Sequence, residues 1–311
     1  MKIKPDYDLV IIGGGPAGLT AGIYAMRAKL NCILIEKKIP GGLALITDWV
    51  ENYPGFPEGI SGADLTDKFI EQAKRFGLKI ENEAAEAIWL DDGLKKIKTD
   101  QRLITAASVI ITAGTSPKKL GIEGETLFYG KGVSTCATCD GFFYRDKIVA
   151  AIGGGDSAVQ ESLFLTKFVK KVWLIHRRDS LRAAKILQER AFKNDKIEIL
   201  WDCIPKKISG RNAVEELTIQ NVKTEEIKDL SIDGCFIFAG TNPNTGFLGD
   251  LVKTDENGFV YTDNNMGTSV KGLFCAGDAR KTPLRQIVTA TGDAAIAVAG
   301  AEKYIENFYE K

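Results

Sequence analysis

The 311-residue sequence has one histidine, no surplus of either charge and no long apolar run. Lysine plus arginine number 41, as do aspartate plus glutamate, so no overall positive field would attract nucleic acid or an anionic membrane. The longest apolar stretch, residues 294–301, is far shorter than the ~20 residues of a membrane-spanning helix. No apolar segment with a small-residue cleavage site stands at the start. We therefore expect a cytoplasmic protein that binds neither nucleic acid nor a membrane.

The sequence also lacks a second close pair of cysteines. Cys136 and Cys139 are separated by two residues, whereas the other four stand singly, at Cys32, Cys203, Cys235 and Cys275. A structural zinc site needs four ligands, usually in two close pairs, so no metal site is expected. Three of the single cysteines, all but Cys203, lie in apolar runs and are predicted to be small buried side chains. In a reducing compartment, a lone Cys-x-x-Cys indicates a reversible dithiol–disulfide pair.

Two segments of the chain repeat one pattern. Residues 7–38 read YDLVIIGGGPAGLTAGIYAMRAKLNCILIEKK, and residues 147–178 read KIVAAIGGGDSAVQESLFLTKFVKKVWLIHRR. Each segment has an apolar run, a triple glycine, apolar residues at helical spacing and a second apolar run. The distance along the chain is 23 residues from Gly13 to Glu36 and again 23 from Gly153 to His176. Both segments are predicted to be βαβ dinucleotide-binding units.

Two similar strand endings mark the domain boundaries. The segments SVIITAGTSP and GCFIFAGTNPNT each place a Gly-Thr turn and a proline after an apolar strand. We predict an α/β fold with two Rossmann-like dinucleotide-binding domains, the second inserted into the first. The first domain would comprise residues 1–115 and 244–311, and the inserted domain residues 116–243.

The first glycine loop favours FAD. Gly13, Gly15 and Gly18 form G-x-G-x-x-G, which allows a tight turn, close approach of a pyrophosphate and close helix packing. Glu36 ends the next strand, where a carboxylate can accept a bond from a ribose hydroxyl. Near the C-terminus, an apolar strand runs into Gly277-Asp278 before another helix, which suits binding of a polyol chain and a flavin ring. Alone, such an AGD segment would be an ordinary turn.

The second glycine loop favours NADPH. Gly153, Gly155 and Ala158 form G-x-G-x-x-A, and His176 stands where Glu36 stands in the first unit. Three arginines follow, at Arg177, Arg178 and Arg182. Guanidinium groups can bind a ribose 2′-phosphate that a carboxylate would repel. The alternative is a solvated basic loop, which its register relative to the glycine loop argues against.

These sites together indicate an order of electron transfer. NADPH gives a hydride to a flavin, which can pass two electrons to a disulfide, and the resulting dithiol can reduce another disulfide by thiolate attack. Asp140 follows Cys139 directly and is a candidate proton carrier for this exchange. The alternative for Asp140 is a turn or helix-capping residue.

The chain resembles, from end to end, the low-molecular-weight thioredoxin reductases, which are pyridine nucleotide-disulfide oxidoreductases. The matching segments are GGGPAGL, ENYPG, CATCDGFF, GGGDSAVQES, HRRDSLRA and AGDARKTPLRQIVTATGDAAIA. The resemblance implies a homodimer that uses FAD and NADPH to reduce thioredoxin or a similar small disulfide protein. It also implies a rotation of the inserted domain about its two connections.

The resemblance further implies roles for single residues. Cys139 would face the flavin, Cys136 would attack thioredoxin and Asp140 would be the acid–base residue. The implied FAD contacts are Gly13, Gly15, Pro16, Ala17, Gly18, Glu36, Lys37, Gly41, Gly42, Leu43, Asn52, Ala113, Gly114, Gly277, Asp278, Arg285, Gln286 and Ile287. The implied NADPH contacts are Gly153, Gly155, Asp156, Ser157, Ala158, His176, Arg177, Arg178 and Arg182. Leu43 departs from the glutamine common in the family, so one side-chain hydrogen bond near the flavin is expected to be missing.

Three other functions remain open from the sequence. A flavin-dependent thiol oxidase would leave the arginine site without a use. A ferredoxin-linked reductase of the same fold would take its electrons from ferredoxin instead of NADPH. A non-catalytic flavin-binding module would use the cysteines for structure alone. The disulfide partner is also open, because a glutaredoxin-like protein suits CATC as well as thioredoxin does.

Overall fold

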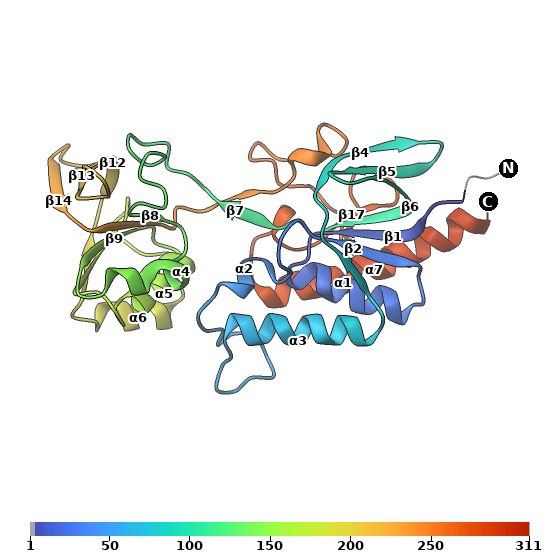
Figure 1. Cartoon of the computed structure of the whole chain (residues 1–311), viewed down its shortest axis with the longest axis horizontal. Helices are drawn as coiled ribbons and strands as arrows, with labels where there is room; N and C mark the ends of the chain where they lie inside the picture. The colour runs from blue at the N-terminus through green and yellow to red at the C-terminus, as the bar shows by residue number, and fades with distance from the viewer. Residues whose placement is uncertain (1–3, 311) are drawn as a thin grey trace. The chain divides into compact units, whose positions relative to one another are not determined.

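The computed structural model describes residues 4–310 and divides into two compact units, each with its own sheet (Figure 1). Unit 1 takes Met1–Ser116 and Asn242–Lys311, and unit 2 takes Pro117–Thr241. The sequence-based boundaries were 115/116 and 243/244. Each unit is described by itself below.

Unit 1 is built on one sheet with the order β3-β2-β1-β6-β5-β4, and β17 pairs with β6. Strands β3, β2, β1, β6 and β17 are parallel, whereas β6, β5 and β4 are joined antiparallel. The central strands are rich in Val, Ile and Leu, as expected for strands buried on both faces. Their bounds are β1 Tyr7–Ile12, β2 Cys32–Ile35, β3 Lys79–Glu81, β4 Ala85–Asp91, β5 Leu94–Thr99, β6 Leu103–Ile111 and β17 Leu273–Cys275.

Three helices cover one face of this sheet: α1 (Pro16–Arg27), α3 (Gly62–Arg75) and α7 (Ile287–Glu310) (Figure 1). Alternate residues of β1 divide between two cores, because successive side chains of a strand point to opposite faces. Leu9 and Ile11 pack with the three helices, and Val10 and Ile12 pack on the other face. The shorter elements of unit 1 are α2 (Gly42–Leu45), η2 (Gly246–Leu248) and η3 (Gly277–Ala279).

Unit 2 repeats the parallel arrangement on a smaller sheet with the order β11-β10-β9-β15-β8. An antiparallel three-stranded sheet, β12-β13-β14, packs beside it in a shared core. The strand bounds are β8 Val133–Ser134, β9 Ile148–Ile152, β10 Lys171–Ile175, β11 Ile197–Leu200, β12 Cys203–Ser209, β13 Glu216–Asn221, β14 Ile227–Ser231 and β15 Gly234–Ile237. The helices are α4 (Ala137–Asp140), η1 (Gly141–Tyr144), α5 (Asp156–Leu165) and α6 (Lys185–Phe192).

The two chain segments that join the units pair with each other. They are the short strands β7 (Thr115–Pro117) and β16 (Thr241–Pro243), which form a two-stranded sheet. Beside them, the Asn244 side chain donates to the Ala113 carbonyl at 2.8 Å and accepts from the Ser116 hydroxyl at 2.6 Å. The predicted α/β class with two βαβ units is therefore confirmed.

Candidate active site

The first glycine loop lies between β1 and α1 and has no room for side chains at two of its glycines. Gly13 has φ +110°, and a Cβ on it would lie 2.5 Å from the Thr112 carbonyl oxygen. A Cβ on Gly18 would lie 1.8 Å from the Gly13 oxygen, so only glycine lets α1 approach the strand. At Gly15 the nearest atom to such a Cβ is the Gly42 Cα, at 3.9 Å. Gly15 is therefore the least crowded of the three glycines, and α1 begins there with no side-chain cap. Uncapped helix amides at such an opening fit a pyrophosphate.

Glu36 turns its carboxylate toward this loop. Its Oε2 accepts a hydrogen bond from the Gly14 amide at 2.6 Å, and its Oε1 accepts one from the Lys38 amide at 2.9 Å. Each carboxylate oxygen has two lone pairs, so capacity for a ribose hydroxyl remains. The position and charge of Glu36 therefore fit the adenosine side of a dinucleotide.

Several of the other predicted FAD residues are brought together from distant parts of unit 1. Gly42 lies against Gly15, and the Gly41 amide donates to the Gly14 carbonyl at 2.8 Å. The Asn52 amide nitrogen donates to Gln286 Oε1 at 3.0 Å, across 234 residues of sequence. The remaining members of the set take ordinary positions. Ala17 is buried in α1 and Pro16 is half-buried, Ile287 begins α7, Gly114 has a positive φ before β7, and Lys37 and Leu43 are exposed.

Two ionisable side chains before the start of α7, Asp278 and Arg285, are half-buried and have no hydrogen-bond partner among residues 4–310. Burial raises the pKa of the Asp278 carboxyl above its usual range, and Arg285 partly opposes this shift. The Asp278 side chain accepts no hydrogen bond from the described residues. Arg285 Nε is buried and likewise unpaired within residues 4–310, and its guanidinium lies 4.1 Å from the centre of the Phe259 ring. Because buried polar groups normally have partners, an acceptor and a donor left open here fit a polar ligand such as a flavin with its ribityl chain.

The second glycine loop lies between β9 and α5. Gly153 has φ +153°, and a Cβ there would lie 2.6 Å from the Ala158 Cβ, so this alanine packs against the turn. A Cβ on Gly155 would meet nothing within 4 Å, and α5 begins there without a side-chain cap. Ser157 is exposed in the first turn of α5. The loop thus offers an opening like that of unit 1, which fits a second pyrophosphate.

His176 is buried beneath this loop instead of facing solvent. Its side chain is 4% exposed, and a Cβ on Gly154 would lie 2.3 Å from the imidazole ring. Its Nε2 lies 3.1 Å from the Ser180 carbonyl oxygen. Burial lowers the pKa of His176 below its usual range, and the nearby arginines add to this effect. A neutral imidazole donating from Nε2 suits these contacts.

The three arginines after His176 are exposed, and none forms an ion pair with a carboxylate in the described part of the chain. The loop that carries them is fastened to the glycine loop at two points. The Arg182 amide donates to the Gly154 carbonyl at 2.7 Å, and the Ala184 amide donates to Asp156 Oδ1 at 2.7 Å. The backbone therefore fixes Arg182 close to the glycine loop, which suits a phosphate on the adenosine ribose.

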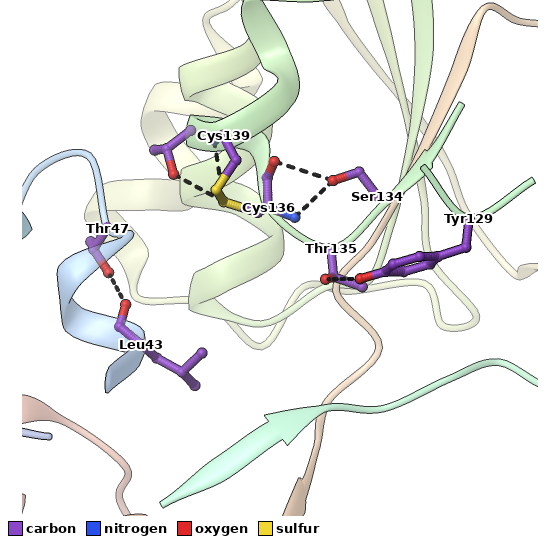
Figure 2. Close-up of a disulfide and its surroundings, with 8 residues drawn as sticks. Leu43, Thr47, Tyr129, Ser134, Thr135, Cys136 and Cys139 are labelled. Atoms are coloured by element: carbon purple, nitrogen blue, oxygen red, sulfur yellow. Dashed lines mark hydrogen bonds between the residues drawn. A yellow bond between two sulfur atoms is a disulfide. The ribbon is translucent and has the colours of Figure 1, made fainter. Parts of the chain in front are cut away.

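Cys136 and Cys139 form a disulfide at the start of α4 (Figure 2). The Cys139 amide donates to Cys136 Sγ at 3.2 Å, and the Thr138 hydroxyl lies 3.3 Å from the same sulfur. Ser134 fixes the preceding backbone, because its Oγ accepts from the Cys136 amide at 3.0 Å and donates to the Cys136 carbonyl at 3.2 Å (Figure 2). Cys136 is half-buried and Cys139 is exposed.

Asp140 occupies the N-cap position of η1, but its side chain makes no capping hydrogen bond. Its amide donates to the Cys136 carbonyl at 3.3 Å, which holds it in the turn of the disulfide. The sequence left a turn or helix-capping residue as the alternative, and of these the structure lacks the capping bond but shows the turn. The Asp140 side chain is half-buried, and its predicted acid–base role stays a prediction.

The other cysteines take no part in this site. All four are buried and reduced, as predicted for three of them. Burial raises the pKa of each thiol, to about 12 for Cys235 and Cys275. Such thiols are poor nucleophiles. The described residues hold no cluster of three or more His, Cys, Asp or Glu side chains suited to a metal ion.

Asp293 was missed by sequence reasoning. It lies on α7 and accepts hydrogen bonds from Gly277 and Arg280, which flank Asp278. A signal was present, because Asp293 is the only charged residue in the otherwise apolar and small stretch 287–301. No periodicity rule indicates which partner such an acid contacts.

The sequence of the chain matches a known protein family. The sequence profile of the pyridine nucleotide-disulphide oxidoreductases matches residues 7–294. The chain therefore belongs to this family. None of its helices within residues 4–310 combines the length and the apolar composition needed to span a bilayer.

Several similar relatives are named thioredoxin reductases. That of Treponema pallidum (strain Nichols) is 44% identical over 98% of this chain and 99% of its own length. That of Bacillus subtilis (strain 168) is 44% identical over 100% of this chain and 98% of its own. A solved structure of thioredoxin reductase from Lactococcus lactis is 42% identical, covers 97% of this chain and 100% of its own, and superposes with a TM-score of 0.95. The resemblance seen in the sequence is thus confirmed, and FAD and NADPH are the cofactors of this group.

Proposed function

We propose that this chain is an NADPH-dependent thioredoxin-disulfide reductase. The observation that carries the proposal is the Cys136–Cys139 disulfide, which lies in a unit that also has a glycine loop flanked by arginines. A structural disulfide would need neither that loop nor the second dinucleotide fold of unit 1.

The residues of each unit fit one cofactor. Unit 1 would hold FAD through the Gly13–Gly18 loop, Glu36 and Asp278. Unit 2 would hold NADPH through the Gly153–Ala158 loop and the arginine loop, residues 177–182. When bound, FAD supplies a two-electron carrier between NADPH and the disulfide.

The dithiol would act on the partner through Cys136. Once the disulfide is reduced, the Cys139 amide, which donates to Cys136 Sγ in the oxidised structure, would be placed to donate to a Cys136 thiolate. The Cys136 thiolate attacks the partner's disulfide, forms a mixed disulfide and releases one partner thiolate. Cys139 then attacks Cys136 Sγ, which restores the internal disulfide and releases the second thiolate. Asp140, fixed beside Cys139, exchanges the proton of the Cys139 thiol.

The partner and the assembly are part of the proposal. Thioredoxin is the expected substrate, as the names of the relatives indicate. A cytoplasmic location suits a dithiol that must cycle, since thiols are kept reduced there. We also propose a homodimer, which the family resemblance implies.

The proposal is tested by NADPH oxidation against a panel of small disulfide proteins, including thioredoxin and a glutaredoxin. Cys136→Ser and Cys139→Ser should each abolish disulfide reduction while NADPH still bleaches the bound flavin under anaerobic conditions. Cys203→Ser, a buried free cysteine of the same unit, is the matched control and should retain activity. Disulfide reduction retained by both site variants would remove the dithiol from the mechanism. Failure of NADPH to bleach the wild-type flavin would favour the oxidase, ferredoxin-linked or non-catalytic alternatives.

A further inference from the structure

Asp293 is a half-buried acid on α7. Its side chain is 14% exposed, and no other residue of the stretch 287–301 is charged. Its Oδ2 accepts two hydrogen bonds, one from the Gly277 amide at 3.2 Å and one from Arg280 Nη1 at 3.2 Å. Removing a carboxylate from water costs free energy, and the two hydrogen bonds to Asp293 offset part of that cost.

One donor, Gly277, opens the turn that carries Asp278, and the other, Arg280, follows that turn directly. This turn is η3, Gly277–Ala279, which follows β17 directly. Gly277 has φ +76°, and a Cβ on it would lie 3.1 Å from the Ala17 Cβ and 3.4 Å from the Ala290 Cβ. The turn is therefore wedged between α1 and α7, and Asp293 fastens its N-terminal end to α7.

The other end of the turn is fastened to residues 260–262. The Val260 amide donates to the Ala279 carbonyl at 3.0 Å, and Arg280 Nε donates to the Thr262 hydroxyl at 2.9 Å. Arg280 is 15% exposed and bridges Thr262 and Asp293. Asp278 is thus held between two fixed points, although its own carboxylate has no hydrogen-bond partner among residues 4–310.

The charge of Asp293 is not itself suited to holding a ligand. Arg280 forms an ion pair with it, and a second carboxylate near Asp278 works against ionisation of Asp278. The contribution of Asp293 is therefore geometric, through an acceptor oxygen at a fixed place.

We propose that Asp293 is a positioning residue of the FAD site, which holds the Gly277–Ala279 turn so that Asp278 meets the cofactor. The inference rests on the proposed function, because it takes FAD as the ligand of unit 1. It assigns the role to the position of Oδ2 and not to the negative charge.

Two substitutions separate position from charge. Asp293→Asn keeps an acceptor oxygen in place and loses the charge, whereas Asp293→Glu keeps the charge and moves the oxygen by one methylene. Apo-protein of each full-length variant is titrated with FAD, and quenching of flavin fluorescence gives the dissociation constant. We expect Asp293→Glu to weaken FAD binding about tenfold, and Asp293→Asn to stay within about threefold of wild type. The absorption band of the bound flavin should change shape in Asp293→Glu only.

Tyr304→Phe is the control for general destabilisation of α7. It removes the hydrogen bond from Lys95 to the Tyr304 hydroxyl on the same helix, far along the sequence from the turn. This control should lower the melting temperature and leave FAD affinity and the flavin band unchanged. NADPH affinity, which depends on unit 2, should be unchanged in all three variants.

The outcomes are distinct. If Asp293→Glu binds FAD as wild type does, or binds it better than Asp293→Asn, the positioning role is wrong. The same holds if Tyr304→Phe loses as much FAD affinity as Asp293→Glu. A wild-type chain that binds NADPH but no FAD would overturn this inference together with the proposed function.

Discussion

The two units place different residues at the same position of the βαβ fold, the end of the second strand. In each, a strand, a glycine loop and a helix lead to a residue at the end of the second strand that lies against the middle glycine. In unit 1 this residue is Glu36, whose carboxylate accepts from the Gly14 amide. In unit 2 it is His176, whose ring lies against Gly154, with its Nε2 3.1 Å from the Ser180 carbonyl oxygen.

The comparison indicates that the residue at this position need not select the ligand, because residues in the following loop can do so. The Glu36 carboxylate accepts a hydrogen bond from the glycine loop and has capacity left for a ribose hydroxyl. His176 is buried under its glycine loop, whereas Arg177, Arg178 and Arg182 are exposed, so the arginines are the residues that we propose for the 2′-phosphate. Sequence reasoning assigned His176 to the NADPH contacts, and its burial favours an indirect role.

The strongest way to break the comparison is to remove the arginine site. Arg177→Ala with Arg178→Ala should raise the KM for NADPH about 100-fold or more, because each charged hydrogen bond to a phosphate is worth about 1.5–3 kcal/mol. Activity with NADH, measured in the same assay, should change little. Equal losses with NADPH and NADH would show that the arginines do not recognise the 2′-phosphate.

Glu36→Ala tests the contribution of the strand-end carboxylate of unit 1 to FAD binding. It removes the acceptor of the Gly14 and Lys38 amides as well as the expected ribose contact, so FAD affinity should fall about tenfold. Titration of apo-protein with FAD measures the effect. Glu86→Ala, an exposed acid of unit 1 paired with Lys98, is the matched control. NADPH affinity should not change in either variant.

Each unit also buries one basic side chain beside an uncharged hydrogen-bond partner. The shifted pKa values of these two side chains predict that stability changes with pH in an alkaline range for unit 1 and in an acidic range for unit 2. Lys95 of unit 1 is 1% exposed, donates to the Tyr304 hydroxyl at 2.7 Å, and burial lowers its pKa to about 8. The unfolded chain therefore holds more protons than the folded one between pH 8 and about 10.4, so stability should rise with pH across this window.

Lys95→Met tests this window. At pH 7 it should stabilise unit 1 by about 1 kcal/mol, because the cost of burying a charge is removed while the Tyr304 bond is lost. The rise in stability above pH 8 should vanish. Hydrogen exchange of the β5 and β6 amides measures it, with the exposed Lys98→Met as control. An unchanged pH dependence in Lys95→Met would exclude Lys95 as its origin.

His176 of unit 2 predicts the smallest effect, on the acid side. Since its folded pKa is lowered, stability is complete above the unfolded pKa of about 6.5 and falls as pH drops through the folded value. His176 is the only histidine, so its proton NMR resonance gives its pKa directly. A pKa above 6.5, or an unchanged acid slope in His176→Gln, would contradict the neutral buried ring.

Much of the site could be predicted because it depends on short-range sequence order. The glycine loops, their spacing to Glu36 and His176, and the Cys-x-x-Cys turn all follow from one strand–turn–helix pattern. The side-chain environments did not follow. His176 is buried and Asp140 is not a cap, because neighbours distant in sequence fill the space around the first and leave the second without a capping bond.

The sequence by itself determined the class of fold, the two dinucleotide loops and the one reactive pair of cysteines, since each rests on local backbone geometry and spacing. Only the tertiary structure decided that Asn52 meets Gln286, that Glu36 faces its glycine loop, and that Asp293 holds the turn of Asp278. These contacts join residues that lie up to 234 positions apart. Their formation depends on how whole helices and strands pack, which no local pattern encodes.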